Sequence, residues 1–173
     1  MIQLIQGDCL IKHEEIKKNS VDLILTDLPY GTTACKWDSI LPYDLLWDIV
    51  SKILKPNGVF ITTATQPFSS TLIVSNIDMF KYAVVWEKSH PTVAHLARKR
   101  IMSKHEDILI FYNKQPTYNP QMTIGEKNHW NKSKWNKSDT QARGSVFKPV
   151  ENRNGNKKFH KSVLYFNSPN RNG

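Results

Sequence analysis

The sequence predicts an α/β fold whose sheet is mostly parallel. Short apolar runs of strand length alternate along the first 113 residues with segments in which apolar residues recur at helical spacing. Strands separated by helices usually pair in parallel, because each helix carries the chain back to the start of the next strand. Hydrophobic residues make up 39% of the 173 residues, which is enough for the core of one domain.

The expected elements follow from apolar patterning and from local breakers. Asn19-Ser20 ends the first helix, Pro42 stands in the first turn of the second, and the breaker KPNG ends that second helix. Serine caps are expected to begin the third helix. The expected strands lie at 1–6, 21–26, 58–65, 82–88 and 106–113, and the expected helices lie at 9–18, 42–54 and 67–75.

The net charge of +9 is concentrated in the second half of the chain. Residues 1–87 hold 7 Lys or Arg and 10 Asp or Glu, whereas residues 88–173 hold 17 and 5. After residue 113 aromatic side chains are interleaved with cations, which suits stacking on bases and contact with phosphates. The sequence therefore predicts an α/β portion at 1–113 and a basic, irregular, nucleic-acid-binding segment at 114–173. A solvated basic tail is the alternative.

Neither the cysteines nor the N-terminus indicates export. Cys9 and Cys35 form no CxxC motif, and the first ten residues, MIQLIQGDCL, lack the layout of a signal peptide. No apolar stretch has the length that a membrane span needs. We therefore expect a cytoplasmic protein with free thiols.

The expected strand at 21–26 delivers an unusual set of side chains to its carboxyl end, in the segment TDLPYGTTACKWD. Ligands of open α/β sheets bind at the carboxyl ends of the strands. There Asp27 offers a carboxylate that can accept a hydrogen bond from an amino group, Pro29 stiffens the turn and Tyr30 offers a flat face. Such a set can hold a planar heterocycle that carries an amino group. A turn cap for Asp27 and a core-rim position for Tyr30 are the alternatives.

The same segment resembles the catalytic D-P-P-Y motif of amino-group DNA methyltransferases, which methylate adenine N6 or cytosine N4. Leu28 replaces the first proline of that motif. Four further stretches resemble family motifs in the expected order, namely QGDCL, LKPNGVFI, VVWEK and SKHEDILIFYNK. The resemblance implies a Rossmann-like methyltransferase sheet, mostly parallel with one antiparallel strand. It also implies S-adenosylmethionine (SAM) as the methyl donor.

The resemblance implies a role for each matching residue. Asp27 and the backbone carbonyl of Leu28 would accept hydrogen bonds from the target amino group. Tyr30 would stack on a base flipped out of double-stranded DNA, and Pro29 would shape the loop. Asp8 would join Asp27 at the SAM site. Phosphate contacts would come from the basic run after WEK and from a lysine near it: Arg98, Lys99, Arg100 and Lys104.

Plainer interpretations stand beside these roles. Asp8 can simply cap the helix that follows it, and both roles are compatible. The run LARKR, residues 96–100, can be a solvated face. His90, His95 and His105 have irregular spacing and no cysteine partner, and the family needs no metal, so no metal site is expected.

Two motifs that the resemblance would place late in the chain are missing. They are a helix like H-P-T-Q-K-P and a strand that ends in D-x-F-x-G-S-G, and none of the seven glycines forms a G-x-G. In the family's sheet the missing strands lie between the strand that ends at Asp8 and the strand that ends at Asp27. We therefore expect an incomplete sheet. A fragment, a complementing polypeptide and a rearranged, inactive sheet are three explanations.

The sequence thus predicts a SAM-dependent DNA methyltransferase that acts on the amino group of adenine. Aspartate at the first motif position favours adenine, because cytosine relatives more often carry serine there. The alternatives are an N4-cytosine enzyme, an inactive DNA-binding remnant, and a relative that methylates RNA or protein. The recognition sequence cannot be read from the chain, because no code maps residues 114–173 to bases.

Overall fold

The computed structural model describes residues 2–125 and 156–166, which fall into two compact units. One unit contains the described residues up to Tyr118 together with 162–166, and the other contains 119–125 and 156–161. The second unit holds a two-stranded antiparallel sheet of β5 (Thr123–Ile124) and β6 (Lys157–Lys158). Much of the predicted basic segment, including Trp130, Trp135 and Phe147, lies outside the described residues.

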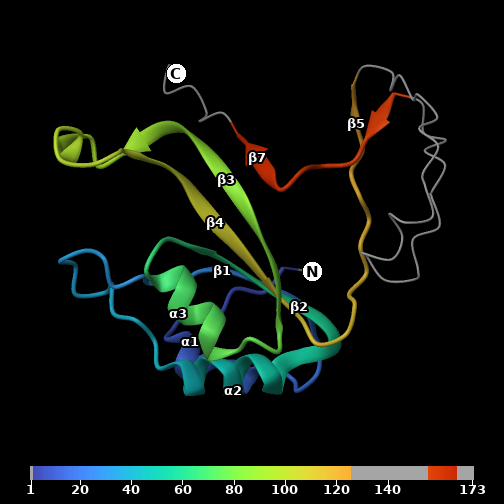
Figure 1. Cartoon of the computed structure of the whole chain (residues 1–173). Helices are drawn as coiled ribbons and strands as arrows, with labels where there is room; N and C mark the ends of the chain where they lie inside the picture. Colours follow the sequence, from blue (N-terminus) through green and yellow to red (C-terminus); the bar gives the residue numbers. More distant parts are fainter. Residues whose placement is uncertain (1, 126–155, 167–173) are drawn as a thin grey trace. The chain divides into compact units, whose positions relative to one another are not determined.

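The first unit is built on a five-stranded sheet in the order β1-β2-β4-β3-β7 (Figure 1). β1 pairs in parallel with β2, β3 pairs in parallel with β7, and β4 is antiparallel to both β2 and β3. Four of the described strands therefore run one way and β4 runs the other, which confirms the predicted mostly parallel sheet with one antiparallel strand. The strands are β1 (Val21–Asp27), β2 (Leu54–Ala64), β3 (Phe80–Thr92), β4 (Ser103–Phe111) and β7 (Val163–Tyr165).

Two α-helices pack on one face of this sheet. Apolar residues of α2 (Tyr43–Ile53) and α3 (Phe68–Ser75) meet alternate residues of β2 and β4 in one core cluster. Its centre is aromatic, because the ring centroids of Trp47, Phe60 and Phe111 lie 5.1 to 5.8 Å apart. The buried members are Leu46, Trp47, Val50, Leu54, Phe60, Ala64, Phe68, Leu72, Met79, Leu109 and Phe111. The described residues include no helix that is long and apolar enough to cross a membrane.

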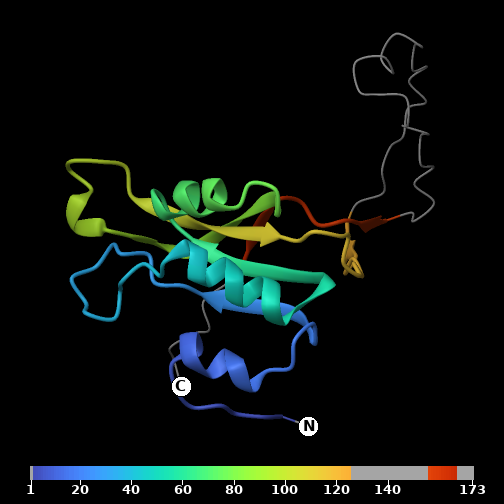
Figure 2. The same cartoon turned by 90° about the horizontal axis from the view of Figure 1, so that it is seen from below.

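β1 forms one edge of the sheet and pairs only with β2 among the described strands. Ile24 points to the face that α2 and α3 cover, whereas Leu23 and Leu25 point to the other face because strand side chains alternate. These two leucines are 49% and 69% exposed. Figure 2 shows the N-terminal segment and the short helix α1 (Cys9–Lys12) at the β1 end of the sheet.

The predictions for the N-terminal segment were wrong in two respects. Residues 2–6 form no strand, and Ile2 and Leu4 are more than 90% exposed, because they pair with no neighbouring strand. The predicted helix at 9–18 is shorter: α1 ends at Lys12 and continues as the 3₁₀ turn η1 (His13–Glu15). Ile16 then has an extended backbone, and it cannot continue the helix.

Several boundaries differ elsewhere. Pro42 precedes the first helical residue of α2 rather than lying in its first turn. The breaker KPNG lies inside β2, which starts four residues earlier than expected. No serine caps α3: Pro67 is its N-cap, and the Ser69 hydroxyl instead donates to Asp107 Oδ2 at 2.7 Å. β3 and β4 extend into a long hairpin, which contains the 3₁₀ turn η2 (Ala94–Leu96) near its end.

Candidate active site

The parallel pairing of β1 with β2 brings two polar side chains together at one edge of the sheet. Asp27 is the last residue of β1, and its partner in the register is Thr63, one residue before the end of β2. Both strands run the same way, so both carboxyl ends meet at this edge. The structure thus places Asp27 at a strand exit, as the sequence predicts, and adds a threonine that the sequence did not indicate.

Asp27, Tyr30 and Thr63 form a closed hydrogen-bonded cluster. The Tyr30 hydroxyl lies 2.7 Å from Asp27 Oδ1 and 2.7 Å from Thr63 Oγ1, and the Thr63 hydroxyl donates to Asp27 Oδ1. Both contacts to the carboxylate end on Oδ1, and Oδ2 accepts no hydrogen bond from the residues that the structure describes. Asp27 is exposed. One carboxylate oxygen is therefore anchored, while the other is free to meet a ligand.

Tyr30 is a neutral hydrogen-bond donor with a packed ring. Burial of the side chain raises the pKa of its hydroxyl, and the neighbouring Asp27 carboxylate acts in the same direction. The ring packs against Phe68 of α3, with centroids 5.3 Å apart and planes tilted by 31°. The hydroxyl and one flank of the ring are therefore held in place, and the ring is half-buried at the rim of the core.

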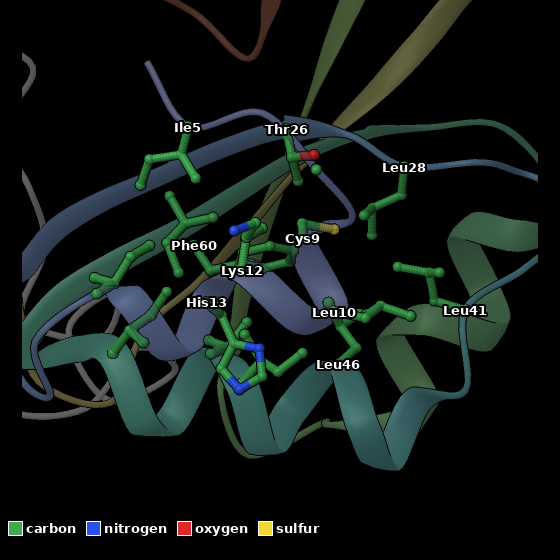
Figure 3. A pocket seen from close by; sticks show the side chains of 16 residues that line it. Ile5, Cys9, Leu10, Lys12, His13, Thr26, Leu28, Leu41, Leu46 and Phe60 are labelled. Carbon is green, nitrogen blue, oxygen red and sulfur yellow. The ribbon is translucent and has the colours of Figure 1, made fainter. Parts of the chain in front are cut away.

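Leu28 and Pro29 complete the predicted motif. Both are half-buried, and Leu28 packs against the core cluster. Leu28 and Thr26 also line a cavity of about 260 Å³ between α1, β1 and α2 (Figure 3). Asp27, which lies between them in the chain, does not line it, because side chains alternate along the strand. The mostly apolar cavity and the Asp27 cluster therefore occupy opposite faces of β1.

The loop after Tyr30 is fastened by Asp38, which the sequence analysis did not single out. Its carboxylate accepts hydrogen bonds from three consecutive backbone amides, those of Gly31 at 2.8 Å, Thr32 at 2.9 Å and Thr33 at 2.7 Å. Gly31 has a φ of +66°, a conformation that glycine adopts readily. The Thr33 side chain first, and then these three amides, lower the pKa of Asp38 to about 2.

Asp8 belongs to a different element from the Asp27 cluster, because it precedes α1 rather than ending a strand. It is the N-cap of α1, where its Oδ1 accepts from the amide of Leu10 at 2.9 Å. The capping interpretation thus describes its contacts, and its role at a SAM site stays a prediction. Asp8 is exposed, so its second oxygen remains accessible.

The predicted phosphate-binding residues lie on the β3–β4 hairpin. Arg98, Lys99 and Arg100 follow η2 in the hairpin connection, and all three side chains are exposed. Lys104 differs from them, because its Nζ donates to Glu87 Oε1 across the hairpin at 2.9 Å. This partner raises the pKa of Lys104. Among the described residues no group of three His, Cys, Asp or Glu side chains could hold a metal ion.

Asp38 and Thr63 are the residues that sequence reasoning missed. Asp38 ends the segment TDLPYGTTACKWD, eight residues after Tyr30. A single acid that follows a glycine turn is the pattern that could have indicated its contacts with the loop backbone. No pattern in the sequence indicated Thr63, because its contact with Asp27, 36 residues earlier in the chain, depends on the register of β1 and β2.

The lowered pKa of Asp38 makes the order of the loop dependent on pH. Because the folded value of about 2 is below the ordinary 3.8, this stabilisation is present above the ordinary value and is lost as the pH falls through about 2. In an acid titration followed by NMR, the amides of Gly31, Thr32 and Thr33 should shift together near pH 2.

Two variants control this titration. Asp38→Asn should remove the inflection, whereas replacing the exposed Asp44 of α2 by Asn should leave it unchanged. An inflection near 3.8 in the wild-type chain would show that the three amide contacts do not stabilise the ionised carboxylate.

Comparisons with known proteins bear on the family and the fold of the chain. A profile of the DNA methylase family, the N6/N4 methyltransferases, matches residues 21–170. The PvuII DNA methyltransferase, described as cytosine-N4-specific, is similar in structure with a TM-score of 0.54 and 15% identity, over 96% of this chain and 57% of that one. M1.HpyAVI in complex with SAM has a TM-score of 0.50 and 20% identity, over 76% of this chain and 62% of that one. No curated protein sequence matches the chain significantly.

These structural similarities concern the fold, and the chain spans less than two thirds of the length of either solved protein. The profile match is broader, because it begins at β1 and covers most of the sequence, including the Asp27–Tyr30 motif and the β3–β4 hairpin. On this match, the chain belongs to the N6/N4 family of DNA methylases.

Proposed function

We propose that this chain contributes the catalytic loop of a cytoplasmic DNA methyltransferase that transfers a methyl group from SAM to the exocyclic N6 of adenine. The observation that carries the proposal is the Asp27–Tyr30–Thr63 cluster at the carboxyl edge of the sheet. It presents one free carboxylate oxygen beside an aromatic ring. Membership of the N6/N4 family supports the same reaction class.

Asp27 would act on the nitrogen that receives the methyl group. A carboxylate oxygen that accepts one N–H of the amino group, with the Leu28 carbonyl on the other, orients the nitrogen lone pair away from the ring plane. SAM, when bound, supplies a methyl group on a positively charged sulfur. The carboxylate would also stabilise the positive charge that develops on the nitrogen as the N–C bond forms and the donor's S–C bond breaks, until one amino proton is lost to solvent. Positioning and electrostatics would therefore supply most of the rate.

Tyr30 would hold the base rather than react with it. An amino group within a duplex is occupied by base pairing, so the base must leave the stack before Asp27 can reach it. The Tyr30 hydroxyl is neutral and bonds to the Asp27–Thr63 pair, which holds the ring in place beside the carboxylate. Adenine is favoured by the first-position aspartate. The similar PvuII enzyme is described as cytosine-N4-specific, which makes N4 of cytosine the second candidate.

Double-stranded DNA would lie along the basic part of the chain. We infer phosphate contacts from Arg98, Lys99 and Arg100, since their side chains are exposed at the hairpin. Lys104 is also a candidate, but its bond to Glu87 would have to be exchanged for a phosphate. We retain 1–113 as the catalytic portion and 114–173 as the target-recognition segment, with β7 of the latter pairing with β3 in the sheet.

The SAM site would be completed by a further polypeptide segment. Asp8 and Asp27 offer only carboxylates, and no glycine pair in the sequence forms the G-x-G turn that receives the other end of the donor. The residues present therefore fit part of the cofactor. β1 is an edge strand whose Leu23 and Leu25 are exposed on one face, so an added strand would pair with its backbone and an added helix on that face would cover the apolar surface. We call a polypeptide with the H-P-x-Q-K-P helix and the D-x-F-x-G-S-G strand the complementing segment.

Replacing Asp27 by alanine should lower methyl transfer about 10²-fold or more, because a charged contact to the reacting nitrogen is lost. DNA affinity should stay within about threefold, since Asp27 makes no phosphate contact. Incorporation of labelled methyl groups into a random-sequence duplex library measures the first effect, using the chain with the complementing segment. Asp22→Ala, at the exposed start of the same strand, is the matched control and should retain activity. An Asp27→Ala variant that keeps more than about a tenth of the activity would remove Asp27 from this role.

Replacing Arg98 and Lys99 by serine should weaken DNA binding and flatten its salt dependence. The DNA-binding constant falls with salt, and each phosphate contact contributes about −0.9 to the slope of its logarithm against the logarithm of salt concentration. The slope of the double variant should therefore be less negative by about 2. Fluorescence anisotropy at several salt concentrations measures this. The control is Lys17→Ser with Lys18→Ser, two exposed cations outside the hairpin. Equal slopes for the two double variants would exclude the hairpin as the phosphate-binding surface.

The chain alone should bind SAM weakly, with a dissociation constant well above micromolar, because only part of the donor has contacts. Adding the complementing segment should restore binding and protect the β1 amides from hydrogen exchange. Titration calorimetry and exchange measurements on the chain with and without the segment test this. Micromolar binding by the chain alone would show that its own residues complete the SAM site.

A further inference from the structure

Thr63 stands where it can control the orientation of the Asp27 carboxylate. Its hydroxyl donates to Asp27 Oδ1 and lies 2.7 Å from the Tyr30 hydroxyl, so it contacts both side chains of the proposed site. β2 positions it there, because Thr63 pairs with Asp27 in the register of the sheet. Its neighbours Thr62 and Ala64 are fully buried on the opposite face, so the backbone that carries Thr63 is anchored by the core.

The protons of the cluster can be accounted for. Thr63 and the neutral Tyr30 have one hydroxyl proton each, and the ionised carboxylate has none. The Thr63 proton goes to Asp27 Oδ1, and the Tyr30 proton goes either to Thr63 Oγ1 or to the same Oδ1. In both arrangements Oδ1 is the oxygen that is occupied. Oδ2 remains available, and the plane of the carboxylate is fixed.

We propose that Thr63 is a positioning residue for amino-group methylation, which fixes Asp27 through Oδ1 so that Oδ2 meets the N–H of the target base. The inference rests on the proposed function. Thr63 itself touches neither the base nor the methyl donor. Without its hydroxyl, Asp27 would be held only by Tyr30, and the carboxylate would rotate about its side-chain bonds into orientations that do not meet the amino group.

Three substitutions separate this role from a structural one. Thr63→Val keeps the β-branched shape, which suits a strand, and removes the hydroxyl. Thr63→Ser keeps the hydroxyl and removes the methyl group. Thr65→Val is the matched control one residue beyond β2, because the Thr65 hydroxyl makes no hydrogen bond to the residues that the structure describes. Thr63→Ala replaces Thr63→Val if circular dichroism shows that the valine variant does not fold.

The kinetic readout is single-turnover methyl transfer from labelled SAM to a random-sequence duplex library, using the chain with the complementing segment. We expect Thr63→Val to lower the rate of transfer about 10- to 100-fold, because a small misplacement of a catalytic group has effects of that size. The half-saturating DNA concentration should change less than about twofold. Thr63→Ser and Thr65→Val should stay within about threefold of the wild-type rate.

A second readout needs neither SAM nor activity. The ¹³Cζ resonance of Tyr30 reports on the hydrogen bonding of its hydroxyl, and Tyr30→Phe assigns it. This resonance should move in Thr63→Val and stay near its wild-type position in Thr63→Ser. In the rate measurements, Tyr30→Phe combined with Thr63→Val should cost less than the sum of the two single effects, because both hydroxyls act on the same carboxylate.

The outcomes test the proposed function and the role of Thr63 separately. A wild-type chain that folds, binds the complementing segment and transfers no methyl group to DNA would contradict the proposed function. An active wild type with a Thr63→Val rate within about threefold of normal would overturn the inference about Thr63 alone. Equal losses in the valine and serine variants, or an unmoved Tyr30 resonance in Thr63→Val, would also overturn it.

Discussion

The parallel pairing of β1 with β2 is the constraint on which the proposed site depends. It sets Asp27 opposite Thr63 at the carboxyl edge, and it sets Ile24 opposite Phe60 in the core. The two consequences are linked, because side chains alternate along a strand. A slip of one residue would move Ile24 out of the core and Asp27 onto the wrong face. Burial of the aromatic core therefore enforces the geometry of a polar site that contributes little burial of its own.

A second constraint keeps Tyr30 beside Asp27 once the chain has left the strand. The turn after Tyr30 would otherwise be a run of small residues with unpaired amides. Asp38 binds three of these amides with one carboxylate, and its side chain is only 8% exposed. The two acids of this segment thus have different functions. Both oxygens of Asp38 accept hydrogen bonds from the backbone, whereas one oxygen of Asp27 has no partner among the described residues. The segment thus contains one structural carboxylate and one proposed catalytic carboxylate.

The sequence predicted those features that local pattern determines. The apolar run before Asp27, the helical spacing in α2 and the succession of strands and helices along the chain from β1 to β4 are all visible in short stretches of sequence. It failed where an element depends on a distant neighbour. Residues 2–6 have the composition of a strand but no strand pairs with them, and the contact of Thr63 with Asp27 arises only from register. The prediction of serine caps on α3 was wrong for the same reason, because the Ser69 hydroxyl donates to Asp107 in β4 instead.

The position of the site within the sheet explains how a chain that spans less than two thirds of the similar solved proteins builds it. The aromatic core joins α2 and α3 to β2 and β4, and none of its buried members precedes Leu46. Several of these buried residues, among them Leu46, Val50 and Phe60, also line the cavity whose other wall is the N-terminal segment with α1. Asp27 lies at the border of the core: Thr63, Tyr30 and Phe68 hold its surroundings from one side, while the edge of β1 that no described strand pairs with lies on the other. In the proposed reaction, the geometry at the target amino group would thus be set by this chain, whereas the geometry of the methyl donor would be set largely by whatever pairs with β1.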